Sequence, residues 1–107
     1  SGMEKDKYEA ELDEAATRIV KRALVLEAIA EANDIEWTPE ELDAEIKSIA
    51  FASRVDRKKF QDYIYGDGDR IFEIAEKIRN RKTVDFIITK VKVTEVEEKK
   101  AEAPVAE

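Results

Sequence analysis

Apolar residues recur at helical spacing through the first third of the chain. From Glu4 onward they fall about every three or four positions, the period of a helix with one apolar face. These positions are Tyr8, Leu12, Ala15, Ala16 and Ile19. Between Ile19 and Ala30, nine of twelve residues are apolar. Because a helix that is apolar nearly all round is usually buried between partners, the pattern predicts a helix over 4–32 whose second half is the central helix of the domain.

A turn and a strong helix start follow. Asn33 and Asp34 tolerate the backbone conformations of helix ends and turns, so they are predicted to end the first helix. Residues 35–37 then form a short extended connection. The string Thr38-Pro-Glu-Glu combines a capping hydroxyl, a proline suited to the first helical position and a glutamate able to complete a capping box. Trp37, beside this start, is interpreted as a hydrophobic staple that closes the turn.

The second predicted helix carries an aromatic residue away from its apolar face. Leu42, Ile46 and Ile49 share one face at ~100° per residue. Phe51 lies about half a turn away from that face, together with Val55, on the side expected to meet solvent. Since large apolar residues are usually buried, the alternative for each such residue is that another helix covers it.

Two more helices are predicted after residue 55. Asp56 is a candidate N-cap of a short helix. The apolar face of that helix consists of Phe60, Tyr63 and Ile64. Residues 66–69 form a turn, and a long helix then spans about 69–90.

The long helix has two apolar stripes. The first is formed by Ile71, Ile74, Ala75 and Ile78. The second lies about 160–200° around the helix and is formed by Val84, Ile87, Ile88 and Val91. Either the helix kinks near residues 79–82, or it is straight and faces partners on opposite sides. The straight helix is favoured because no Gly or Pro marks a break.

The last part of the chain is predicted to be an extended tail. Residues 91–96 alternate between apolar and polar as a strand does, but a lone strand has no pairing partner. Residues 97–107 are dominated by Glu, Lys and Ala and are expected to form a disordered acidic tail. Ser1-Gly-Met is interpreted as an expression scar. The predicted fold is therefore all-α, with a domain of about four helices over 4–96 and an extended C-terminal tail.

Composition excludes several classes of function. Hydrophobic residues make up 43% of the 107 residues and charged residues 42%, with a formal net charge of −7. The negative charge disfavours direct nucleic-acid binding, and no apolar stretch approaches the roughly 18 residues of a membrane span. The chain has neither Cys nor His, so it lacks the usual nucleophile, base and metal ligands. An enzyme is disfavoured, and no cofactor or metal is expected.

Charged clusters offer only weak alternatives. Asp67-Gly-Asp resembles the start of a calcium loop, but the further ligand positions are missing, so a turn is favoured. Adjacent carboxylates such as Glu40 and Glu41 arise by chance among 26 acidic residues. A carboxylate-based enzyme is thus the weakest hypothesis. The basic clusters, at residues 54–59 and 79–82, are interpreted as solvated faces that balance local acid, with ribosomal RNA or acidic client segments as the alternative contacts.

Four strings in consistent order resemble a known family. They are Arg18-Ile-Val-Lys-Arg-Ala-Leu-Val-Leu-Glu-Ala-Ile-Ala-Glu, Thr38-Pro-Glu-Glu-Leu-Asp-Ala-Glu-Ile, Arg79-Asn-Arg-Lys-Thr-Val-Asp-Phe-Ile-Ile and Lys92-Val-Thr-Glu. Together they resemble the carboxy-terminal chaperone domain of trigger factor, the bacterial ribosome-associated folding factor, over about Ala15 to Glu95. The resemblance implies the long-helix arrangement of that domain and of SurA-like peptide-binding proteins.

The resemblance also implies a function. It indicates an ATP-independent, cytoplasmic chaperone module that binds unfolded or nascent polypeptides. Family members contact the ribosome through one domain and isomerise prolyl bonds through another. Neither domain is found in this sequence, so the chain is interpreted as an excised, non-enzymatic fragment. No direct nucleic-acid or membrane partner is expected.

The candidate client-binding residues are those that lie away from the predicted core. They are Phe51, Val55, Tyr65, Val84, Ile87, Ile88 and Val91. Scattered apolar side chains among adaptable polar ones suit weak contact with many clients. The alternative function is a helical adaptor that docks one folded partner or dimerises through its long helices. A homodimer of the fragment is expected if the apolar stripes are otherwise left in water.

Overall fold

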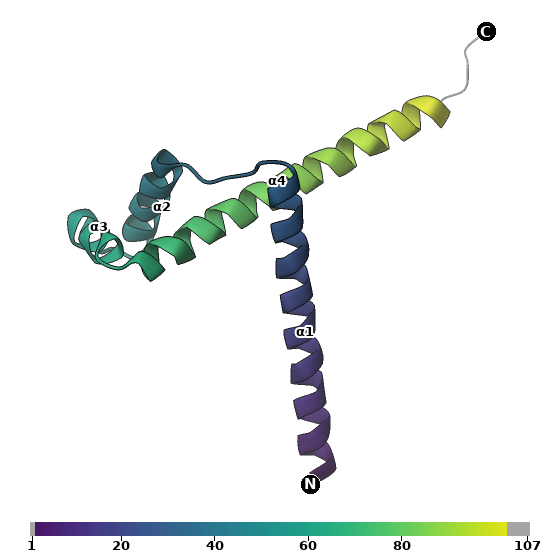
Figure 1. Ribbon diagram of the computed structural model, residues 1–107, viewed down its shortest axis with the longest axis horizontal. Coiled ribbons are helices and arrows are strands. Elements are labelled where there is room, and N and C mark those ends of the chain that lie inside the picture. Colours follow the sequence, from purple (N-terminus) through teal and green to yellow (C-terminus); the bar gives the residue numbers. More distant parts are fainter. Residues whose placement is uncertain (1, 103–107) are drawn as a thin grey trace. The chain divides into compact units, whose positions relative to one another are not determined.

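The computed structural model describes residues 2–102, and its regular structure in that range is entirely helical (Figure 1). The helices are α1 (Gly2–Ala32), α2 (Pro39–Ala52), α3 (Arg57–Tyr65) and α4 (Gly68–Glu102). The predicted all-α class with about four helices is confirmed. Across this described range, none of the helices contains an apolar segment of the length that crossing a bilayer requires.

The chain divides into two compact units, Ser1–Asp34 and Ile35–Glu107. The residues of the domain predicted over 4–96 fall in both units. In the first unit, α1 ends at the predicted place. The Asn33 side-chain amide donates to the carbonyl oxygen of Ile29 at 2.8 Å, and Asp34 has a φ of 53°. Both features are typical of a helix end at which Asn and Asp are tolerated.

The prediction that the second half of α1 is buried is wrong. Ile19 and Leu24 are 66% and 65% exposed, and Val20 and Val25 are each 56% exposed. Within α1 only Ala30 is buried. An apolar surface all round a helix indicates that the helix can be buried, but it does not show that the same chain supplies the covering partner.

The predicted start of α2 is confirmed in detail. The backbone N–H of Glu41 donates to the Thr38 hydroxyl oxygen at 3.1 Å, and the N–H of Thr38 donates to Glu41 Oε1 at 3.0 Å. This reciprocal pair is a capping box, with Pro39 at the first helical position. Two donors that a helix start leaves without partners are thereby satisfied.

At the starts of the next two helices, aspartate side chains accept hydrogen bonds from backbone N–H groups. Asp56 Oδ1 accepts the N–H of Lys59 at 3.0 Å, which confirms its predicted role as the N-cap of α3. Asp67 accepts the N–H of Asp69 through Oδ1 at 2.9 Å, so the proposed turn leads directly into α4. Tyr63, expected on the apolar face of α3, is 55% exposed, and the Arg70 guanidinium lies over its ring at 3.7 Å.

The core of the second unit forms where α2, α3 and α4 pack against one another (Figure 1). Its buried cluster consists of Leu42, Ile46, Ile64, Ile74 and Ile78. Trp37, Ile49, Phe60 and Ile71 pack against this cluster. The arrangement confirms the predicted apolar face of α2 and the first stripe of the long helix. It also places Trp37 against the core beside the start of α2, as a staple requires.

The end of α2 reverses the chain without a glycine. Arg54 has a φ of 55°, in the left-handed region that costs most residues about 1–2 kcal/mol. Its N–H donates to the Phe51 carbonyl at 3.2 Å, and the N–H of Val55 donates to the Ala50 carbonyl at 3.1 Å. This is the hydrogen-bond pattern of a Schellman motif. The motif turns Val55 back toward the last turn of α2.

The long helix is unbroken and continues beyond its predicted end. It runs from Gly68 to Glu102 without a kink at residues 79–82, which confirms the straight alternative (Figure 1). The extended tail predicted over 91–96 is wrong, and so is the disorder predicted from Glu97 as far as residue 102. Glu, Lys and Ala are strong helix formers, and β-branched valines cost only a few tenths of a kcal/mol each, roughly. Residues 103–107 lie outside the described part of the chain.

Candidate functional site

The connection before α2 is fixed to α4 by two cationic side chains. Arg79 Nε donates to the carbonyl oxygen of Ile35 at 2.9 Å, and its guanidinium lies 3.8 Å from the Glu36 carboxylate. Lys82 Nζ donates to the carbonyl oxygen of Glu36 at 2.6 Å and to Glu41 Oε1 at 2.9 Å. We call this set the Arg79–Lys82 clamp. It holds residues 35–41 to the middle of α4.

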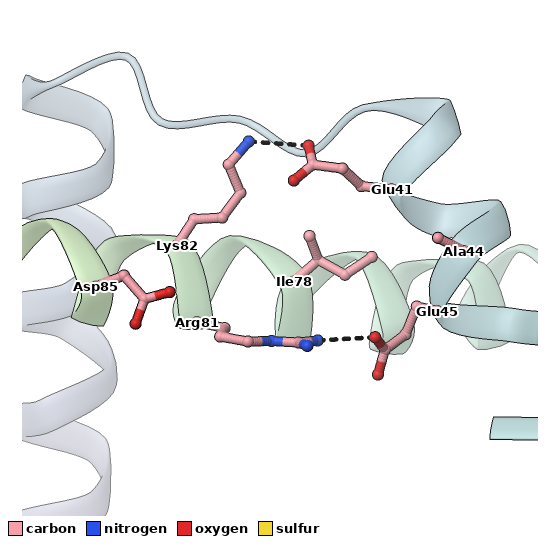
Figure 2. Close-up of a pocket in the computed structure, with 7 residues that line it drawn as sticks. All are labelled: Glu41, Ala44, Glu45, Ile78, Arg81, Lys82 and Asp85. Atoms are coloured by element: carbon pink, nitrogen blue, oxygen red, sulfur yellow. Dashed lines mark hydrogen bonds and ion pairs between the residues drawn. The ribbon is translucent and has the colours of Figure 1, made fainter. Parts of the chain in front are cut away.

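The clamp shows that the second basic cluster has a structural role. Arg81 pairs with Glu45 at 3.0 Å and Lys82 with Glu41, so both balance local acid as predicted (Figure 2). Arg79 differs, since only 11% of its side chain is exposed. The hydrogen bond from Arg79 to a backbone carbonyl could not be predicted from the sequence, because every residue has such a carbonyl.

The clamp also perturbs the capping carboxylate. The hydrogen bond from Lys82, followed by those from Thr38, lowers the pKa of Glu41 below its ordinary value despite partial desolvation. A lowered pKa in the folded state means that folding favours the ionised carboxylate. This contribution to stability is present above the pKa of the unfolded chain and is lost as the pH falls through the lower, folded value.

A hollow between α2 and α4 lies beside the clamp. It has a volume of about 340 Å³. Its lining comprises Glu41, Ala44, Glu45, Ile78, Arg81, Lys82 and Asp85 (Figure 2). Two of its three carboxylates are paired across the hollow with cations. These two ion pairs link α2 to α4 across the hollow. Among the residues that line it, no nucleophile lies beside a general base. Over the described residues, no cluster of three or more potential metal-ligating side chains occurs.

The candidate client-binding residues are largely exposed. Phe51 is 87% exposed on α2, and Val55 is 47% exposed just beyond it. On α4, Val84, Ile88 and Val91 are 40–51% exposed, whereas Ile87 is half-buried. We call these four residues of α4 the second stripe. It lies on the same helix as the buried first stripe, and three of its four residues remain exposed.

The structure brings only some of these residues together. Phe51 and Val55 line one groove at the end of α2. Tyr65 ends α3 and is 43% exposed, but its hydroxyl donates to the Asp43 carboxylate of α2. That hydrogen bond raises the pKa of the Tyr65 phenol, because the neutral hydroxyl is the donor. Tyr65 thus has a structural partner that the sequence did not indicate.

Further exposed apolar residues were missed. On α1 they include Ile19, Val20, Leu24 and Val25, which the sequence analysis assigned to the core, and on α4 Phe72 is 64% exposed. The available signal was the same apolar run on α1. It was misinterpreted because an apolar run shows that a helix can be covered but does not show which partner covers it.

These observations define a helical module with a small core, a charged clamp and apolar side chains exposed on several helices. The chain belongs to the bacterial trigger factor family. A family model described as the C-terminus of bacterial trigger factor protein matches residues 1–89. No solved structure gives a significant match.

Relatives agree with this assignment. The trigger factor of Geobacter sp. (strain M21) is 41% identical over 89% of this chain and 22% of its own length. That of Citrifermentans bemidjiense is 38% identical over 89% and 22%, and that of Geobacillus kaustophilus is 35% identical over 87% and 21%. The chain therefore spans about a fifth of the length of these relatives.

Proposed function

We propose that this chain is an ATP-independent chaperone module that binds unfolded or nascent polypeptides through exposed apolar side chains on its helices. The observation that carries the proposal is the uncovered apolar surface of Phe51, Val55 and the second stripe. Membership of the trigger factor family supports a chaperone-related role. As the family resemblance implies, the proposal also places this module in the cytoplasm. It is part of a protein that contacts the ribosome through a different domain.

The physical argument concerns what an unfolded chain offers. Such a chain exposes short apolar segments, and burying apolar area against a partner gains roughly 25 cal/mol per Å². Phe51 and the second stripe lie among charged residues of α2 and α4, so each patch is small. Small patches give weak contacts at several places, which lets one module hold many different clients.

Aggregation of unrelated unfolded proteins tests the proposal. The chain should suppress aggregation of at least two such proteins at near-stoichiometric ratios and without nucleotide. The triple variant Phe51→Gln, Val84→Gln, Ile88→Gln removes exposed apolar groups and keeps good helix formers on α4. We expect about tenfold more variant to be needed, equivalent to a combined loss of about 1.4 kcal/mol of binding energy.

The matched control is Glu73→Gln with Lys77→Gln, because both residues are exposed on α4 and the net charge is preserved. The control should act like the parent chain. If the triple variant also acts like the parent, the proposed surfaces are not the binding surfaces. If the parent suppresses no aggregation at all, the dedicated adaptor is the better description.

A further inference from the structure

A groove at the end of α2 combines an apolar floor with a cationic rim. Its volume is about 460 Å³, within the range of ligand sites. The floor is formed by Ala44, Ala50, Phe51 and Val55, and its rim carries Lys47 and Arg57. We call it the α2–α3 groove. The Schellman motif builds it, since the hydrogen bond from Val55 N–H to the Ala50 carbonyl sets Val55 beside the last turn of α2.

The segment that contains most of the groove residues is positively charged, although the chain as a whole is acidic. Residues 47–59 contain five cations and a single carboxylate, Asp56, in a chain whose formal net charge is −7. Asp56 already accepts the N–H of Lys59 as the cap of α3. The five cations are Lys47, Arg54, Arg57, Lys58 and Lys59.

These cations differ from those of the clamp. Arg81 and Lys82 on α4 each lie within 3.0 Å of a carboxylate. None of these five cations, of which Lys47 and Arg57 line the groove, forms an ion pair within residues 2–102. Their charge is therefore available to an incoming anion, and an anionic group beside an apolar one would be held more strongly than either alone.

We propose that the α2–α3 groove takes an extended polypeptide segment in which a bulky apolar side chain lies within two residues of an Asp or Glu. The apolar side chain rests on Phe51 and Val55, and the carboxylate pairs with Lys47 or Arg57. This inference rests on the proposed function and names the class of client segment for one of its surfaces. It also distinguishes the groove from the second stripe of α4.

Binding of short labelled peptides to the full chain tests this inference. Three ten-residue peptides share one central Phe, whose flanking residues are both Glu, both Gln or both Lys. Fluorescence anisotropy at low salt should show the Glu peptide binding at least about fivefold more tightly than the Gln peptide. The Lys peptide should bind most weakly. The preference should shrink at high salt, because surface charges are screened.

Charge reversal at the rim supplies the decisive comparison. Lys47 and Arg57 are exposed, and a Glu at the first residue of α3 suits the helix dipole, so Lys47→Glu with Arg57→Glu should fold normally. This variant should prefer the Lys peptide. The control Lys77→Glu with Lys92→Glu makes the same change in net charge on exposed positions of α4, and it should keep the preference for the Glu peptide.

The inference is overturned if the three peptides bind equally, or if the control loses the preference as fully as the rim variant. It is also overturned if a short single-stranded oligonucleotide competes the Glu peptide off at lower concentration than unlabelled Glu peptide does. Aggregation assays on the same variants separate this inference from the proposed function. Suppression without a peptide preference refutes only the groove assignment, whereas a peptide preference without suppression refutes only the chaperone proposal.

Discussion

Replacing Ile46 with Ala is expected to lower the free energy of unfolding by about 3 kcal/mol. Ile46 is 2% exposed and lies within the cluster formed with Leu42, Ile64, Ile74 and Ile78. The substitution removes several methyl and methylene groups and leaves a cavity that a small three-helix core cannot fill by collapse. Since small domains have a total stability of only about 5–15 kcal/mol, a loss of this size unfolds a substantial part of the population on mild heating.

Urea denaturation followed by Trp37 fluorescence measures this effect. Trp37 is the single tryptophan and packs against the cluster, so its emission reports the second unit. Phe51→Ala is the control, because it deletes a larger side chain that is 87% exposed. The control should change stability by no more than about 0.5 kcal/mol. Equal effects of the two substitutions would show that the core does not lie where α2, α3 and α4 meet.

Replacing Arg79 with Ala is expected to cost about 2 kcal/mol of stability. The substitution removes the donor that satisfies the Ile35 carbonyl and the cation beside Glu36. A hydrogen bond to a charged group contributes roughly 1.5–3 kcal/mol when its loss leaves a partner unsatisfied. The connection over 35–38 should then loosen from α4, and Trp37 emission should shift to longer wavelength even before the core unfolds.

Arg81→Ala is the matched control for the clamp. Arg81 forms an ion pair with Glu45 on the same helices, but 56% of its side chain is exposed. Exposed ion pairs contribute about 0–1 kcal/mol, so this variant should remain close to the parent. If Arg81→Ala destabilises the chain as much as Arg79→Ala, the backbone contacts of Arg79 do not anchor the connection.

Local rules predicted much of the fold. The capping box at Thr38 and Glu41 and the cap at Asp56 formed as expected, because each depends on residues no more than three positions apart. The first stripe of α4 and the apolar face of α2 also formed the core, since periodicity alone defines a helix face. Residues 91–96 were misassigned to an extended tail. Valines that alternate with lysine, threonine and glutamate also fit a helix, and these residues belong to α4.

The candidate site was predictable only in part. The exposure of Phe51 and of most of the second stripe followed from their angular position on a helix. The α2–α3 groove did not, because it depends on a left-handed Arg54 at a place where Gly is the usual signal. The surface of α1 was assigned to the core for a related reason. A pattern shows that a helix can be covered, but the covering partner depends on the whole chain.

Residue-resolved NMR of the chain mixed with an unfolded client tests the central claim most directly. With methyl labels on valine and isoleucine, addition of a reduced, unfolded protein should shift or broaden the signals of Val55, Val84, Ile88 and Val91. The buried methyl groups of Ile46 and Ile74 should change little. This result would show that clients bind the exposed apolar surface of the folded module. Changes confined to the buried isoleucines, or no changes at client concentrations that block aggregation, would contradict it.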